Sequence, residues 1–242
     1  MTIKSFLPQG LKNLETELRT IKGVESHLIH PQALNSLSSL QHLAKEQGFD
    51  IYIVSSFRSF DRQKLIWNEK ASGKRDLYNP EGTNKLEFST LSQEEILNSI
   101  LRWSGLPGFS RHHWGTELDI VDKNAFPEEN YSVQLTIEEV NGIFSPFYQW
   151  LETQINNNNS FGFYMPYSED RNGVSPEKWH ISYAPLSQEI EEKLTFECFK
   201  ESIQGPAYED LELIELIKKN LLSIYENYIT NTCDIPFKNF IS

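Results

Sequence analysis

Hydrophobic positions in this 242-residue chain follow helical spacing in some segments and strand-like runs in others. Residues 31–47 carry a leucine at every third position from Leu34 onward, which places the leucines on one face of a helix. Pro31 suits the first turn of such a helix and Gly48 suits its end. The pattern therefore predicts one amphipathic helix over residues 31–47.

Short apolar runs that are rich in β-branched and aromatic residues predict strands. They lie at residues 51–55, 117–121, 161–164 and 179–183. Further helices are predicted after Phe60, after the capping-box sequence that begins at Ser92, and from Pro146. This mixture of helices and strands predicts an α+β fold.

The C-terminal part of the chain has a purely helical pattern. Residues 187–231 predict two helices, with a break near Gly205 and Pro206. One face carries Leu211, Ile214, Ile217, Leu221 and Ile224. We expect this face to pack on the rest of the protein, and a partner-binding surface is the alternative. The chain is thus divided into an N-terminal extension (1–30), a core (31–185) and a helical C-terminal extension (186–242).

The composition is that of a globular protein with an acidic surface. Hydrophobic residues make up 38% and charged residues 23%, and the formal net charge is −12. Such a surface repels phosphate, so no nucleic-acid partner is expected. No stretch approaches the ~20 apolar residues of a membrane span. The first residues lack the apolar core of a secretory signal, so a cytoplasmic location is expected, with a periplasmic or released location as the alternative.

The two cysteines, Cys198 and Cys233, both lie near the C-terminus. Their spacing matches no metal-binding motif, and two cysteines do not make a disulfide scaffold. Two free thiols are favoured, and a single disulfide is the alternative.

Two short segments carry residue types that suit a catalytic zinc site. The first runs from Ser110 to Asp119 and contains His112, and the second is Glu177-Lys-Trp-His180. A catalytic zinc needs three protein ligands and an open position for water, and His112, Asp119 and His180 supply suitable donors. A carboxylate outside the ligand set must carry the proton, and Glu177 is the candidate.

The two segments resemble motifs of a known family. They match the Ser-x-His-x-x-Gly-x-x-x-Asp and Glu-x-Trp-His motifs of the zinc D-Ala-D-Ala carboxypeptidases, in the same order and with a similar separation. That family includes the vancomycin-resistance D,D-peptidases and phage endolysin peptidases, and it shares a superfamily with lysostaphin-type enzymes and the hedgehog signalling domain. Residues 56–60 are similar to its aromatic-Arg-Ser element. The resemblance covers residues 34–184.

The resemblance implies a fold, a cofactor and further site residues. It implies a small antiparallel sheet that forms the floor of a zinc cleft, with helices at its sides. One zinc ion is implied, with Glu177 activating the water. Arg58, Gln63 and Ser110 are implied to contact the substrate, and Arg58 is also implied to face the developing negative charge, which suits a guanidinium.

Two residues of the first segment have open roles. Glu117 shares a strand face with Asp119, so it is a partner of a ligating histidine, a residue that narrows the substrate pocket, or a solvated carboxylate at a strand end. His113 is expected at the cleft rim, unless it exchanges roles with His112. His27, His30 and His42 are interpreted as structural or surface residues, and Trp114 and Trp179 as braces of the site.

The function implied by the resemblance is a carboxypeptidase that removes a terminal D-alanine from peptidoglycan-derived peptides or muropeptides. D,D action on pentapeptides and L,D action on tetrapeptides both stay open, and the expected cytoplasmic location slightly favours L,D action. The alternatives are an L-Ala-D-Glu endopeptidase of lysin type and a zinc-bearing binding protein without catalysis. The presence of Glu177 argues against the binding protein.

Overall fold

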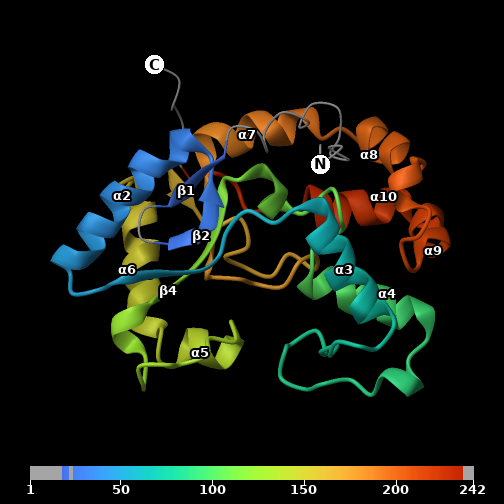
Figure 1. Cartoon of the computed structure of the whole chain (residues 1–242), viewed down its shortest axis with the longest axis horizontal. Coiled ribbons are helices and arrows are strands. Elements are labelled where there is room, and N and C mark those ends of the chain that lie inside the picture. The colour runs from blue at the N-terminus through green and yellow to red at the C-terminus, as the bar shows by residue number, and fades with distance from the viewer. Residues whose placement is uncertain (1–17, 22–23, 237–242) are drawn as a thin grey trace.

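A computed structural model describes residues 18–21 and 24–236 of the chain (Figure 1). A four-stranded antiparallel sheet lies among helices, with the strand order β3-β4-β6-β5. Its strands are β3 (Ile51–Ser55), β4 (Glu117–Asp122), β6 (His180–Tyr183) and β5 (Phe163–Tyr164). The predicted α+β fold with a small antiparallel sheet is confirmed. Strand β5 is shorter than the predicted segment 161–164, because Phe161 and Gly162 adopt left-handed φ angles of 54° and 89°.

The register of the sheet brings the two sequence segments of interest together. Strand β4 is buried along its whole length and pairs with β3 on one side and β6 on the other. Asp119 lies opposite Ser55 of β3 and opposite His180 of β6. Two residues that are far apart in the sequence are therefore direct neighbours across a strand pair.

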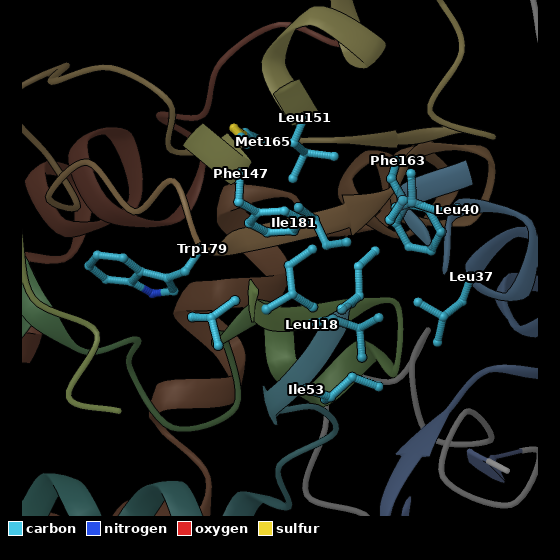
Figure 2. Packing of buried hydrophobic residues seen from close by; sticks show 14 of the residues in the cluster. Leu37, Leu40, Ile53, Leu118, Phe147, Leu151, Phe163, Met165, Trp179 and Ile181 are labelled. Atoms are coloured by element: carbon cyan, nitrogen blue, oxygen red, sulfur yellow. The ribbon is translucent and has the colours of Figure 1, made fainter. Parts of the chain in front are cut away.

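One hydrophobic core lies between the sheet and two helices, α2 (Pro31–Glu46) and α6 (Ser145–Asn156). Figure 2 shows side chains of this first core, with Leu37 and Leu40 of α2 and Leu151 of α6 near the apolar side chains of the sheet. Leu40 and Leu151 are fully buried. Each such leucine contributes about 1.5–3 kcal/mol relative to an exposed position. The predicted helix over residues 31–47 is confirmed with its leucine face inward.

A second hydrophobic core joins the C-terminal helices to two helices of the core region, α3 (Phe60–Ala71) and α4 (Gln93–Trp103). Trp67 of α3, Ile100 of α4 and Phe199 of the C-terminal part are all fully buried there. In Figure 1 the C-terminal helices pass from α7 at the top to α8, α9 and α10 at the right, above α3 and α4. The expected packing of the apolar C-terminal face onto the protein is observed.

The C-terminal part contains more breaks than the predicted two helices. It forms α7 (Ala184–Lys193), α8 (Phe196–Ile203), α9 (Ile214–Lys219) and α10 (Leu221–Ile224), with a 3-10 turn at Pro206–Tyr208 and a π-helical turn at Tyr225–Ile229. Thr195 starts a new helix by accepting a hydrogen bond from the Cys198 amide. Leu213 adopts a left-handed φ of 65°, which interrupts the next stretch. Cys198 and Cys233 are both free thiols.

The described part of the N-terminal extension is a hairpin of β1 (Arg19–Ile21) and β2 (Val24–Ile29). It holds the two loops that lead to the site, because Phe57 N–H donates to Leu28 O at 3.2 Å and His30 N–H donates to Gly115 O at 2.7 Å. The rest of the predicted extension lies outside the described residues. The remaining elements are α5 (Ile137–Asn141) and 3-10 turns at Phe88–Thr90, Arg111–Trp114 and Lys123–Ala125. Within the described ranges, no helix combines the length and apolar character needed to cross a membrane.

Candidate metal centre and cleft

The 3-10 turn at Arg111–Trp114 carries the first histidine of the site. Gly115 ends the turn with a left-handed φ of 71° and directs the chain into β4. This backbone angle favours glycine, because side chains with a Cβ atom rarely adopt it. His112 is thereby placed beside the start of β4.

His112, Asp119 and His180 form a buried cluster, and one ligand atom from each lies within 4.8 Å of the others. His112 Nε2 is 3.4 Å from Asp119 Oδ2, and His180 Nδ1 is 3.2 Å from Asp119 Oδ1. Asp119 Oδ1 and His180 Nδ1 are both buried without a hydrogen-bond partner. Buried polar atoms without partners are rare, and a shared cation would satisfy both. The donor set therefore fits a metal ion with mixed nitrogen and oxygen ligands.

The far nitrogen of each histidine is held by a protein acceptor. His112 Nδ1 lies 2.8 Å from Ser56 O, and His180 Nε2 lies 2.8 Å from Glu117 Oε2. Since a carbonyl or carboxylate oxygen only accepts, these nitrogens carry the protons. The other ring nitrogens, His112 Nε2 and His180 Nδ1, are therefore directed into the cluster.

Glu117 is thus the hydrogen-bond partner of His180, a candidate ligand, and its full burial excludes a solvated strand-end carboxylate. Ser182 Oγ donates to it at 2.7 Å, and Arg111 forms a buried ion pair with it at 3.4 Å. Burial alone would raise the pKa of Glu117, but the charge of Arg111 and the hydrogen bond from His180 outweigh burial and lower the pKa to about 2. Glu117 is ionised at neutral pH.

The arginine that compensates Glu117 is itself held on several sides. Its guanidinium lies 4.3 Å from the Trp114 ring centre, and it pairs with Glu191 of α7. Arg111 also donates to Tyr164 Oη at 3.0 Å. The C-terminal helix α7 therefore contributes a charge to the network behind the metal cluster.

The two cluster residues that lie on the sheet, Asp119 and His180, have opposite pKa shifts. Burial disfavours the charged form of each, but the nearby histidines hold the pKa of Asp119 far below its usual range. For His180, burial lowers the pKa, but the neighbouring carboxylates of Asp119 and Glu117 favour the charged ring, outweigh burial and raise the pKa to about 9. Because a metal binds only the unprotonated nitrogen, metal binding at His180 must release a proton.

Glu177 lies beside the cluster and outside it. Its Oε2 is 3.7 Å from His180 Nδ1, and the His180 amide donates to Glu177 O at 3.0 Å. Burial raises the pKa of Glu177 to about 7, against the lowering effect of His180 and Arg58. A divalent cation at the cluster would oppose this shift. Glu177 is placed to exchange a proton near neutral pH.

The structure separates the three expected substrate contacts. Arg58 and Ser110 line the cleft, whereas Gln63 is fully buried behind Arg58 and does not line it. Arg58 Nη1 donates to Gln63 Oε1 at 2.9 Å, and Gln63 Nε2 donates to Gly105 O at 2.6 Å. Through these two hydrogen bonds, Gln63 orients the Arg58 side chain.

His113 is fully buried, away from the expected position at the cleft rim. Its Nδ1 lies 2.5 Å from Arg58 O, and its Nε2 accepts from Gly108 N–H at 3.0 Å. Burial lowers the pKa of His113 to about 3, so the ring is neutral and both nitrogens have partners. His113 supports the loop that carries Arg58, and it is His112 that joins the metal cluster.

A cleft of about 420 Å³ opens over the metal cluster. Its walls include Tyr167, whose ring centre lies 5.2 Å from that of His180, and aromatic residues such as Trp103. Trp179 also lines the cleft. Tyr167 and Arg111 are site residues that the sequence did not indicate. Arg111 occupies a variable position of the first motif, and Tyr167 lies outside both motifs, so no motif signal identified either residue.

A buried cluster of nitrogen and oxygen donors, with a separate carboxylate beside it in an open cleft, is the arrangement of a metal-dependent hydrolase. The chain belongs to the VanY D-alanyl-D-alanine carboxypeptidase family, whose profile matches residues 26–186. This confirms the family resemblance, and the match begins somewhat before the predicted residue 34.

The chain is also similar to individual proteins and solved structures. An uncharacterized protein of Haemophilus influenzae is 38% identical over 81 residues, which is 34% of this chain and 55% of that relative. The chain spans about half the length of the curated relatives it matches first. Among solved structures, VanYB in complex with D-alanine-D-alanine has 21% identity and a TM-score of 0.49, over 73% of this chain and 82% of that chain. The LdcB LD-carboxypeptidase has 18% identity and a TM-score of 0.49, over 88% and 78%.

Proposed function

We propose that this protein is a zinc-dependent carboxypeptidase that removes a terminal D-alanine from peptidoglycan stem peptides. The observation that carries the proposal is the convergence of His112, Asp119 and His180 beside Glu177 in one cleft. Membership in the VanY family supports the same reaction class.

Zinc fits the cluster because its donors are two imidazoles and one carboxylate, which matches the three-ligand pattern of catalytic zinc. The unpartnered Asp119 Oδ1 and His180 Nδ1 are the atoms that such an ion would satisfy. When bound, zinc lowers the pKa of a coordinated water and polarises a carbonyl.

The protein's own residues supply the remaining steps. Glu177 takes a proton from the attacking water on its carboxylate and returns it to the nitrogen of the leaving D-alanine. Arg58 lines the cleft as a charged donor for the oxygen of the scissile carbonyl as negative charge develops there. Gln63 and Ser55 hold the Arg58 guanidinium through hydrogen bonds of 2.9 and 3.2 Å. The Tyr167 ring packs edge-on against the His180 ring, with ring centres 5.2 Å apart.

The test is a digest of purified muropeptides, analysed by mass spectrometry with and without a chelator. We expect loss of one alanine from pentapeptides for D,D action, or from tetrapeptides for L,D action, and no loss after chelation. Cleavage between L-Ala and D-Glu would instead assign an endopeptidase. Zinc content is measured in parallel on the unaltered protein and on two variants.

The variants separate catalysis from metal binding. Glu177→Gln should retain stoichiometric zinc and lose turnover by about 10²–10⁴-fold, the usual contribution of a general base. His180→Ala should lose zinc and activity together. If a zinc-loaded, folded protein cleaves none of the muropeptides and binds them equally well with Glu177→Gln, a binding protein replaces the enzyme in this proposal.

A further inference from the structure

Lys70, in the last turn of α3, places its ammonium group beside the cleft, and no step proposed above uses it. Its Nζ donates to Ser104 Oγ at 2.5 Å, and Ser104 is part of the cleft wall. The Lys70 side chain is only partly exposed. Burial lowers its pKa to about 8, against the raising effect of Glu177. A partly buried ammonium with a single neutral partner is costly to the folded state.

Lys70 is unusual among the cations of this protein. Within the described ranges, the lysines and arginines that are not exposed form ion pairs with carboxylates, except for two residues. Those two are Arg58 and Lys70. The side chain of Arg58 donates hydrogen bonds to Gln63 and Ser55, and that of Lys70 donates to Ser104. All three partners are neutral. In a chain with a net charge of −12, two cations beside the same cleft that form no ion pair with a described carboxylate indicate an anionic ligand.

The two cations differ in their position relative to the metal cluster. Arg58 lines the cleft together with the three residues of the cluster. Lys70 reaches the same cleft through its hydrogen bond to Ser104, a wall residue outside the cluster.

We propose that Lys70 binds the C-terminal carboxylate of the substrate peptide, beside Ser104. Arg58 then interacts with the oxygen of the scissile carbonyl and not with this carboxylate. This inference rests on the proposed function and makes Lys70 the specificity-determining residue for a free peptide end. A peptide with a terminal carboxylate supplies the anionic partner that Lys70 lacks. A peptide chain that continues past the scissile residue would leave the ammonium without a partner.

The test compares the dissociation constants of two pairs of peptides. The peptides are diacetyl-L-Lys-D-Ala-D-Ala and diacetyl-L-Lys-D-Ala, each as the free acid and as the C-terminal carboxamide. Binding is measured by calorimetry on the zinc-loaded full chain with Glu177→Gln, which prevents turnover. Addition of Lys70→Met should weaken binding of the preferred free acid about tenfold or more, as for other hydrogen bonds to charged groups. Binding of its carboxamide should change by less than about twofold.

Two further variants control for charge and for structure. Lys70→Arg keeps the positive charge and should retain most of the preference for the free acid. Lys74→Met removes an exposed lysine just beyond the same helix and should leave all four dissociation constants unchanged. Circular dichroism verifies that each variant is folded.

The inference is overturned if Lys70→Met weakens the free acid and the carboxamide equally, or weakens neither. It is also overturned if neither free acid binds the zinc-loaded protein. Failure of the proposed catalysis gives a different result: no muropeptide is cleaved, yet the free acid still binds more tightly than the carboxamide in a Lys70-dependent way.

Discussion

Replacement of Glu117 by glutamine tests whether the buried carboxylate sets the metal affinity of the site. Glu117 accepts hydrogen bonds from Thr116 Oγ1 at 2.9 Å, Ser182 Oγ at 2.7 Å and His180 Nε2 at 2.8 Å. It also balances the charge of Arg111. A glutamine has one acceptor oxygen and an NH₂ group, so in either orientation the NH₂ group faces hydrogen-bond donors.

Two effects of different size follow from this loss. Breaking a buried ion pair costs about 3–5 kcal/mol of folding free energy. Because Glu191 still pairs with Arg111 in this variant, we expect a cost near the lower end of this range. At about 2–4 °C per kcal/mol for a chain of this size, Tm falls by about 6–20 °C. Loss of the partner that orients His180 should weaken zinc binding about 10–100-fold.

The assay is competition for zinc with a chelator of known affinity, at a temperature well below the Tm of the variant. The matched control is Asp122→Asn, which removes another buried carboxylate from the same strand. Asp122 accepts from the backbone amides of Asp50 and Asn124 and lies outside the metal cluster, so this variant should lose stability and keep its zinc affinity. If Glu117→Gln lowers Tm but binds zinc as tightly as the unaltered protein, the reasoning about His180 is refuted.

Two more predictions concern the pH dependence of binding and the docking of the C-terminal part. Since Lys70 is protonated below its pKa of about 8, the preference for a free peptide carboxylate should be complete below pH 7 and fade as the pH rises through 8 to 9, whereas Lys70→Arg should flatten this profile. The charged groups that act on Lys70 are Glu177, Arg58 and Arg75. Gly108→Ala places a Cβ atom 2.1 Å from Tyr208 Oη and should lower stability by about 1–3 kcal/mol in thermal unfolding. Gly48→Ala is the control, because Gly48 has a similar φ of 86° with no atom within 4 Å; equal losses in both variants would contradict the clash.

Much of the local structure could be predicted from the sequence. The helix after Pro31, the capping box at Ser92 and the strand at residues 51–55 are encoded by neighbouring residues. Such signals act over a few residues, so they need no knowledge of the tertiary fold. Where the prediction differed, the cause was a local angle that carries no clear signal, as at Phe161 and Leu213 with their positive φ values.

The candidate metal ligands could also be identified from the sequence, because the motif that contains His112 and Asp119 and the motif that contains His180 are contiguous patterns. Their convergence required the register of β4 against β6. The fold places His112 and not His113 in the candidate cluster, since adjacent side chains on a 3-10 turn point in different directions.

The sequence by itself determined which elements form and which residue types could bind a metal, because hydrophobic period, helix caps and motif spacing are properties of neighbouring residues. Tertiary structure alone decided what each side chain does. Glu117 meets His180 across 63 positions of sequence, and Lys70 meets Ser104 across 34. Such pairs depend on strand register and helix packing, and burial then sets their charge. For that reason the hydrogen bond of Glu117 to His180 and the position of the Lys70 ammonium beside the cleft became visible only in the folded protein.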